Sequence, residues 1–95
     1  MIKVTLNGRN MNSKEIAHLY MKWNLQVPEY YGTNLDALWD VLSTYDKPIQ
    51  INLINKDKLI ENLGDYGEAI IEVFQDAQKE NNNINFEIIE GKQGE

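Results

Sequence analysis

Three short segments of the chain, residues 2–6, 49–54 and 84–89, have the apolar patterns of strands. The first alternates apolar and polar residues and ends at the turn signal Asn7-Gly8. The second begins directly after Pro48, a position that a strand tolerates. These patterns predict three strands, each followed or preceded by polar turn residues.

Between these segments, apolar residues recur at helical spacing. The first predicted helix has the capping pair Asn12 and Glu15, and the residues expected to face its core are Ile16, Leu19, Tyr20 and Trp23. That choice of face places His18, the only histidine, on the solvated side. A second helix is predicted with Thr33 as its N-cap. The residues expected to face the core from this helix are Leu35, Leu38 and Leu42.

Two more helices are predicted before the last strand. Asn55 is the expected cap of a helix over 56–63, and Gly64 fits its C-terminal end. Asp65 and Glu68 have capping-box spacing at the start of a longer helix. The core-facing residues expected in that helix are Ile70, Val73, Phe74 and Ala77.

The predicted order is strand, helix, helix, strand, helix, helix, strand. Because helical crossovers join consecutive strands, we expect a parallel sheet with right-handed connections. The fold class is therefore α/β, a small three-stranded parallel sheet packed with four helices. We expect residues 1–90 to form a single domain and residues 91–95 to form a flexible tail.

Composition narrows the classes of partner. The 95 residues are 42% hydrophobic, which is ordinary for one folded domain, and no apolar run approaches a membrane span. The N-terminus lacks a signal-peptide pattern and the chain has no cysteine, so we expect a cytoplasmic location. A formal net charge of −6 disfavours nucleic acid and anionic membranes as partners and favours basic proteins.

Motifs for catalysis, cofactors and metals do not occur in the sequence. No glycine-rich phosphate loop follows a strand, no His, Cys or carboxylate cluster has metal-ligand spacing, and Ser13 and Ser43 sit in no nucleophile motif. Asp36 and Asp40 lack the contrasting environments that separate a general acid from a general base. We therefore expect no enzyme activity, no cofactor and no metal.

The segment 28–42 has the composition of a binding surface. Gly32 breaks the chain after Tyr30-Tyr31, and Asp36 and Asp40 then stack at i, i+4 away from the leucine stripe, with Trp39 at its margin. Exposed acids bordered by aromatic rings suit a cationic partner. Two simpler interpretations remain open: Asp36 stabilises the first helical turn, and Trp39 belongs to the core.

The run from Leu25 to Asp40, LQVPEYYGTNLDALWD, closely resembles the signature of the barstar family, intracellular protein inhibitors of the secreted ribonuclease barnase. The similarity continues more loosely through residues 73–80, and the order of elements agrees from end to end. The resemblance implies the same α/β fold. It also implies an inhibitor that fills a cationic nuclease cleft with carboxylates where RNA phosphates would bind.

The resemblance further implies roles for single residues. Asp40 matches an acid that enters the phosphate site, Asp36 matches an acid that binds an arginine at the cleft edge, and Tyr30 matches a tyrosine that stacks on the catalytic histidine of the nuclease. The residues expected on this partner-binding surface are Tyr30, Tyr31, Asn34, Leu35, Asp36, Trp39, Asp40, Thr44, Tyr45 and Asp76.

The sequence departs from the family pattern at several positions. Asp76 stands where the family usually has Glu, and it joins the surface only if the second and last helices pack side by side. Thr44-Tyr45 replaces a Gly-Trp pair in a segment that is one residue shorter. Lys47 replaces a tyrosine before Pro48, a proline that can be cis in the family, so either isomer is open. These changes favour a cognate nuclease that differs from barnase.

We predict a cytoplasmic inhibitor, monomeric when free, of a small basic ribonuclease. An acidic interaction module on the same scaffold, binding another basic toxin or a regulatory protein, would use the same surface, and composition does not separate the two. A small hydrolase using Asp36 and Asp40 is a third alternative, and it predicts turnover by the isolated protein.

Overall fold

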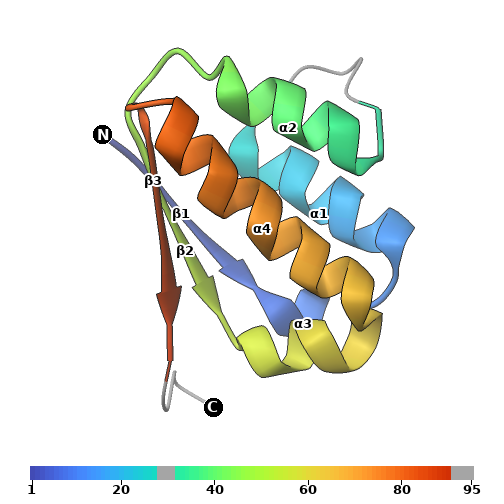
Figure 1. Cartoon of the computed structure of the whole chain (residues 1–95). Coiled ribbons are helices and arrows are strands. Elements are labelled where there is room, and N and C mark those ends of the chain that lie inside the picture. Colours follow the sequence, from blue (N-terminus) through green and yellow to red (C-terminus); the bar gives the residue numbers. More distant parts are fainter. Residues whose placement is uncertain (28–31, 91–95) are drawn as a thin grey trace.

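The computed structural model describes residues 1–27 and 32–90 (Figure 1). Its elements are β1 (Ile2–Asn7), the 3₁₀ helix η1 (Gly8–Asn10), α1 (Lys14–Leu25), α2 (Leu35–Ser43), β2 (Ile49–Ile54), α3 (Lys56–Leu63), α4 (Asp65–Glu80) and β3 (Ile84–Ile89). The strands and α-helices follow the predicted order. The predicted tail, 91–95, lies outside the described residues.

The sheet has the order β1-β2-β3, and both strand pairs are parallel. In its middle, Val4 lies beside Ile51, and Ile51 lies beside Phe86. The predicted three-stranded parallel sheet with four helices is therefore confirmed.

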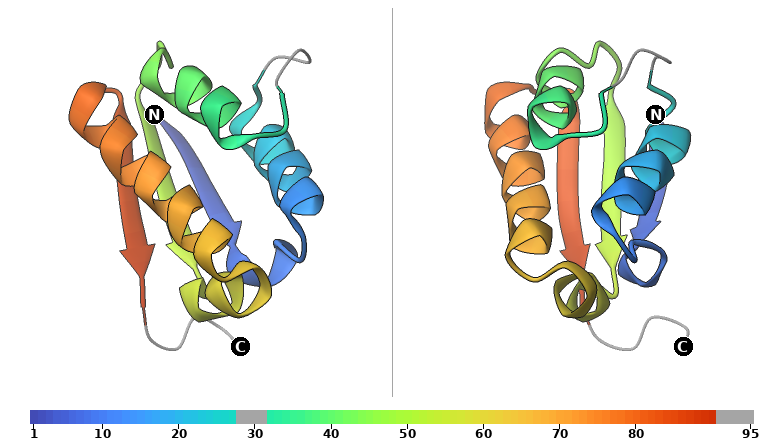
Figure 2. Two further views of the ribbon diagram at one scale, coloured as in Figure 1. Left: turned by 45° about the vertical axis from the view of Figure 1, so that its right-hand side comes forward. Right: turned by 90° about the vertical axis from the view of Figure 1, so that its right-hand side faces the viewer.

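Among the described residues, the helices lie on one face of this sheet (Figure 2). On that face α1 contacts β1, α4 contacts β3, and α2 packs against α4. The other face carries polar side chains, of which Lys3, Thr5 and Glu87 are exposed. Because one face stays in contact with solvent, the strands alternate apolar and polar residues, which parallel strands buried on both faces do not show.

The core lies between the sheet and the helices. Leu38 and Leu42 of α2 are buried there as predicted, and the Phe74 and Phe86 rings stack at 4.9 Å between centroids. Burial of each large apolar side chain stabilises the fold by roughly 1.5–3 kcal/mol. This core fixes α2 on α4, so the outer face of α2 has a defined position.

The predicted inward face of α1 is wrong. Ile16, Leu19 and Trp23 are 47%, 43% and 78% exposed. The side chains that α1 buries are those of Ala17, His18, Met21 and Leu25. Tyr20 lies between the two faces, and its hydroxyl accepts a hydrogen bond from the Asn7 N–H at 2.9 Å.

The predicted solvated position of His18 is also wrong. Its imidazole is fully buried, and Nε2 lies 2.6 Å from the Tyr66 hydroxyl of α4. The Lys14 ammonium lies 4.7 Å from the centroid of the Tyr66 ring. Burial lowers the pKa of His18 below its ordinary value of 6.5, because the charged imidazolium loses hydration there. The hydrogen bond makes a polar residue acceptable in the core.

Three helix caps differ from the prediction by one residue. Ser13, not Asn12, caps α1 by accepting the Ile16 N–H, and Asn34, not Thr33, caps α2. Gly64, not Asp65, is the N-cap of α4. It is also the C-cap of α3, and its φ is 57°. These shifts are small because neighbouring Asn, Ser and Thr residues are almost equally good caps.

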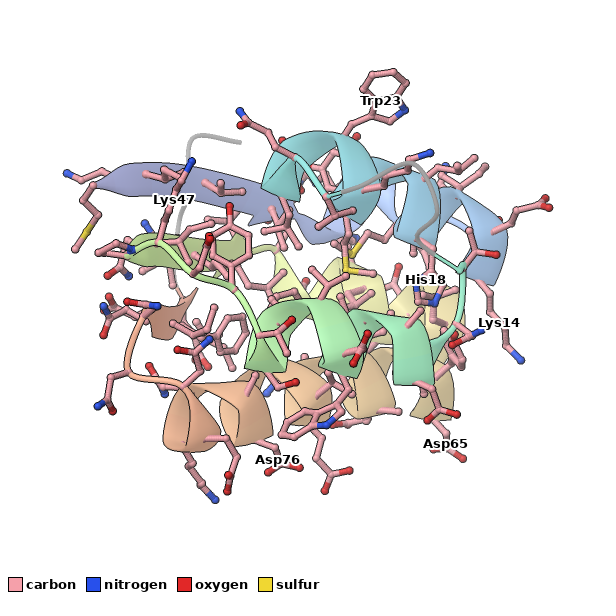
Figure 3. All side chains as sticks on the ribbon, turned by 90° about the horizontal axis from the view of Figure 1, so that it is seen from above. Lys14, His18, Trp23, Lys47, Asp65 and Asp76 are labelled. Atoms are coloured by element: carbon pink, nitrogen blue, oxygen red, sulfur yellow. The ribbon has the colours of Figure 1, made fainter. Side chains whose placement is uncertain are left out.

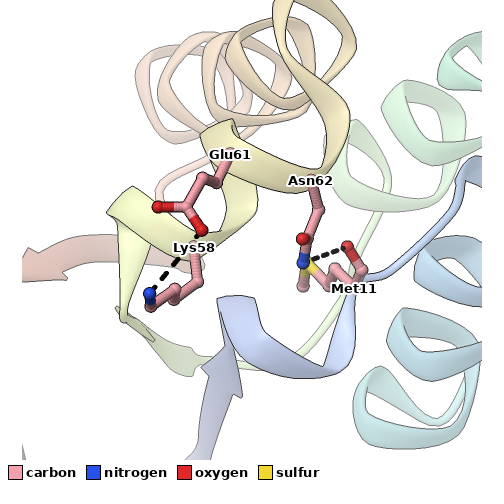
Figure 4. Close-up of polar contacts among 4 residues, drawn as sticks. All are labelled: Met11, Lys58, Glu61 and Asn62. Atoms are coloured by element: carbon pink, nitrogen blue, oxygen red, sulfur yellow. Dashed lines mark hydrogen bonds and ion pairs between the residues drawn. The ribbon is translucent and has the colours of Figure 1, made fainter.

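The lower end of the sheet is closed by η1 and α3. A Cβ on Gly8 would lie 2.2 Å from the Asn55 carbonyl oxygen, so only glycine permits this close approach. The Asn62 side-chain amide also donates to the Met11 carbonyl at 3.3 Å (Figure 4). These contacts hold α3 at the opposite end of the molecule from the segment that joins α2 to β2.

Candidate functional site

Helix α2 presents two carboxylates to solvent on the side opposite its core stripe. Its first turn is set by Asn34, whose Oδ1 accepts the Ala37 N–H at 2.7 Å. Burial of Leu38 and Leu42 then fixes the rotation of the helix, so Asp36 and Asp40 face outward and are exposed. The helix therefore holds both acids on a rigid support.

No cation of the described chain neutralises these acids. Within residues 1–27 and 32–90 the one ion pair joins Lys58 and Glu61 of α3, at 3.6 Å (Figure 4). Like charges at i, i+4 weaken an isolated helix, so the Asp36 and Asp40 pair costs a few tenths of a kcal/mol. Such an arrangement leaves a negative surface available to an external cation.

A third acid lies on the neighbouring helix. Asp76 is exposed on α4, and Figure 3 shows its side chain on the outer side of that helix. Since α2 packs against α4, the structure meets the condition on which Asp76 was expected to join Asp36 and Asp40. Glu72 and Glu80 lie four residues before and after Asp76 on the same helix, and both are also exposed.

Two apolar residues of the predicted surface lie partly in the core and partly in solvent. Trp39 and Leu35 are half-buried and pack against the core, as the simpler interpretation of Trp39 had it. Part of each side chain remains accessible. Tyr30 and Tyr31, the two aromatic residues expected beside the acids, lie outside the described residues.

A hollow of about 390 Å³ adjoins the C-terminal end of α2. The residues that line it are Ile2, Gln26, Val27, Asp40, Val41, Thr44, Tyr45, Asp46 and Lys47. It thus brings Asp40, Thr44 and Tyr45 together, three of the predicted site residues. A second hollow of about 410 Å³, at Asn55–Asp57 and Ile89, contains none of them.

Hydrogen bonds hold the segment after α2 in place. Thr44 Oγ1 donates to the Asp40 carbonyl oxygen at 2.7 Å, and the Tyr45 hydroxyl donates to the Leu25 carbonyl oxygen at 3.2 Å. Burial, with a smaller contribution from the charge of Asp46, raises the pKa of Tyr45 above 10.0. The Lys47–Pro48 bond is trans, which settles the isomer that the sequence left open.

Two asparagines that follow α4 hold the same segment in place. The Asn81 amide donates to the carbonyl oxygens of Leu42 and Tyr45, both at 2.9 Å, and Asn83 donates to the Tyr45 carbonyl at 3.0 Å. They act from the turn between α4 and β3, 36–39 residues away. No local pattern in the sequence signals such a contact.

Comparison with known proteins decides the family. The model of the family described as "Barstar (barnase inhibitor)" matches residues 1–89. The chain belongs to the barstar family. A relative from Bacillus subtilis (strain 168), "Putative ribonuclease inhibitor YrdF", is 41% identical over 81 residues, which cover 84% of this chain and 89% of the relative.

Barstar-family membership confirms two expectations. The family is one of inhibitors, so the chain is not an enzyme. The second confirmed expectation is the resemblance of the sequence to the barstar family itself.

The described residues form neither a metal site nor a helix that could span a membrane. Residues 1–27 and 32–90 contain no group of three His, Cys, Asp or Glu side chains that would hold a metal ion. Over the same residues, no helix has the length and apolar character needed to cross a membrane.

Proposed function

We propose that this barstar-family protein inhibits a small basic ribonuclease by covering its cationic active site with α2 and the adjoining segments. The observation that carries the proposal is the exposed pair Asp36 and Asp40, which no described Lys or Arg neutralises and which the core of the protein holds in a fixed position. The name of the Bacillus subtilis relative agrees with this role.

Electrostatics explain why such a surface suits a ribonuclease. A catalyst that binds RNA needs cationic groups for the phosphates, and carboxylates one helical turn apart offer anionic groups in the same cleft. The net charge of −6 adds long-range attraction, so association is fast at low salt and slows as ionic strength rises. The affinity itself rests on a few groups that lose water at the centre of the interface.

We assign unequal roles to the three acids. Asp40 lies at the rim of the hollow beside Thr44 and Tyr45, and we propose that it enters the phosphate site of the nuclease. Asp36, one turn earlier, would bind an arginine at the cleft edge. Asp76 approaches from α4, and because its side chain is short, we expect it to act mainly on the association rate.

The remaining predicted residues complete the surface. Thr44 and Tyr45 lie next to Asp40, and Trp39 and Leu35 contribute their accessible parts. Tyr30 and Tyr31 belong to the same proposal through the family signature, with Tyr30 stacking on the catalytic histidine of the nuclease. We place this activity in the cytoplasm, where an inhibitor would protect cellular RNA.

Cleavage of a fluorogenic RNA by a panel of small basic ribonucleases tests the proposal. We expect the protein to suppress at least one of them at equimolar concentration. Asp40→Asn should then weaken inhibition by roughly 30-fold or more, since a desolvated cationic site loses its partner. Glu87→Gln removes one exposed charge from the uncovered face of the sheet and should leave inhibition unchanged.

The failure modes are distinguishable. Tight binding to a basic protein without nuclease activity, with RNA cleavage unaffected throughout the panel, would replace the ribonuclease by another basic partner. Equal losses from Asp40→Asn and Glu87→Gln would show that overall charge, not the acidic face of α2, determines binding.

A further inference from the structure

Helix α1 leaves a row of large apolar side chains in solvent. Ile16, Leu19 and Trp23 are 47%, 43% and 78% exposed, and Figure 3 shows Trp23 pointing away from α2 and α4. They recur one turn apart along a single helix face. Scattered apolar residues on a surface are ordinary, whereas a contiguous row that includes a largely exposed tryptophan is typical of an interaction site.

The charges beside this row are balanced. Glu15 and Lys22 are seven residues apart, so they flank the same side of the row at its two ends. Lys14 is engaged within the chain, over the Tyr66 ring. The face thus combines an apolar centre with one acid at its start and one base at its end.

This arrangement is complementary to itself. With a rise of 1.5 Å per residue, Ile16 lies about 4.5 Å before Leu19 along the helix axis, and Trp23 lies about 6 Å after it. A two-fold axis near Leu19 therefore brings Ile16 of one antiparallel helix against Trp23 of the other. The same axis brings Glu15 against Lys22, and it does so twice.

We propose that the α1 row is the contact for a second copy of this chain, with the two α1 helices packed antiparallel about Leu19. The self-complementary order of acid, apolar row and base favours a second copy over an unrelated partner. This inference differs from the expectation of a monomer. Its basis is independent of ribonuclease binding, so either proposal can fail alone.

The surface buried between the two α1 helices is small, so the dimer is weak. A 12-residue helix is about 18 Å long, and a single pair of such helices buries less than the roughly 1,200 Å² of a stable interface. We therefore expect a reversible dimer with a Kd on the order of 0.1–1 mM. Trp23 and Asp76 lie on opposite sides of the molecule in Figure 3, so the proposed contact leaves Asp76 of each copy accessible.

Sedimentation equilibrium of the full chain, from about 0.01 to 2 mM, tests the contact. We expect a monomer–dimer equilibrium that Trp23→Lys abolishes. Glu15→Lys and Lys22→Glu should each weaken it about fivefold or more, because each places like charges together twice. The double variant Glu15→Lys/Lys22→Glu should restore it, since the pair is then re-formed in reverse.

Lys3→Glu is the matched control, because it changes the net charge as Lys22→Glu does but lies on the uncovered face of the sheet. It should leave dimerisation unchanged. A monomer at all concentrations, a double variant as weak as the single ones, or an equal effect of Lys3→Glu and Lys22→Glu would each overturn the proposal. Far-UV circular dichroism confirms that every variant is folded.

Discussion

Helices α1 and α2 lie on the same side of one sheet, and both have apolar residues at helical spacing, yet they use them differently. In α2 the predicted stripe is the buried one, with Leu38 and Leu42 in the core. In α1 the predicted row is exposed, and Ala17 and Met21 face the sheet instead. Periodicity therefore identifies a helix more securely than it identifies the face that the helix buries.

The reason lies in the opposite side of each helix. Across from the stripe of α2 stand Asp36 and Asp40, which would be costly to bury, so its orientation is determined. Helix α1 has apolar residues on two sides, and the side that it buries carries Ala17, Met21 and Leu25. The polar atom of His18, which argued against that face, is satisfied by Tyr66 across 48 residues.

The largest expected effect compares a leucine in the buried stripe of α2 with a leucine in the exposed row of α1. Leu38→Ala empties a core site and should lower the free energy of unfolding by about 2–5 kcal/mol. Leu19→Ala, on the exposed row, should lower it by less than about 1 kcal/mol. Urea denaturation at low protein concentration measures both, and a loss above 2 kcal/mol for Leu19→Ala would contradict the orientation of α1.

A second substitution tests how the end of α2 is held. Asn81→Ala removes two hydrogen bonds to the carbonyls of Leu42 and Tyr45, so we expect a loss of about 1–3 kcal/mol in stability. Ribonuclease inhibition should weaken as well, because the segment bearing Thr44 and Tyr45 loses its clamp. Asn82→Ala, an exposed neighbour, is the control and should change neither stability nor inhibition by a measurable amount.

The buried side of α1 also predicts a pH dependence. Burial lowers the pKa of His18 in the folded state, so the unfolded chain binds more protons near and below pH 6.5. The stability associated with neutral His18 is thus complete above pH 6.5 and falls as the pH is lowered through the folded-state pKa. Denaturation midpoints from pH 8 to 5 measure this slope, and a His18→Gln variant with the same slope would refute the assignment.

The smallest effect concerns the acidic face of α2. Asp40→Asn relieves a like-charge pair near the C-terminal end of the helix, so we expect stability to rise by about 0.2–0.5 kcal/mol. Asp36→Asn should change stability less, because Asp36 also favours the first helical turn. Urea denaturation of the two variants and the unmodified chain measures these differences in the free energy of unfolding. A stability loss for Asp40→Asn would indicate an internal partner for that carboxylate.

Some of these features were predictable from the sequence, and others were not. The order of elements along the chain, the parallel pairing and the exposure of Asp36 and Asp40 follow from local spacing together with a specific family motif. The caps at Ser13 and Asn34 were missed by one residue because their neighbours, Asn12 and Thr33, are comparable caps. The partners of His18 and Asn81 depend on tertiary packing across 36–48 residues, which no local pattern encodes.

An NMR map of the contact surface shows whether the acidic face of α2 binds the ribonuclease. An isotope-labelled sample of the chain, titrated with an inactive variant of the ribonuclease that it inhibits best, reports each backbone amide by NMR. We expect chemical-shift changes concentrated in α2 and at Thr44 and Tyr45, with Trp23 and the uncovered face of the sheet unchanged. Shifts confined to α1, with the amides of Asp36 and Asp40 unmoved, would contradict this expectation.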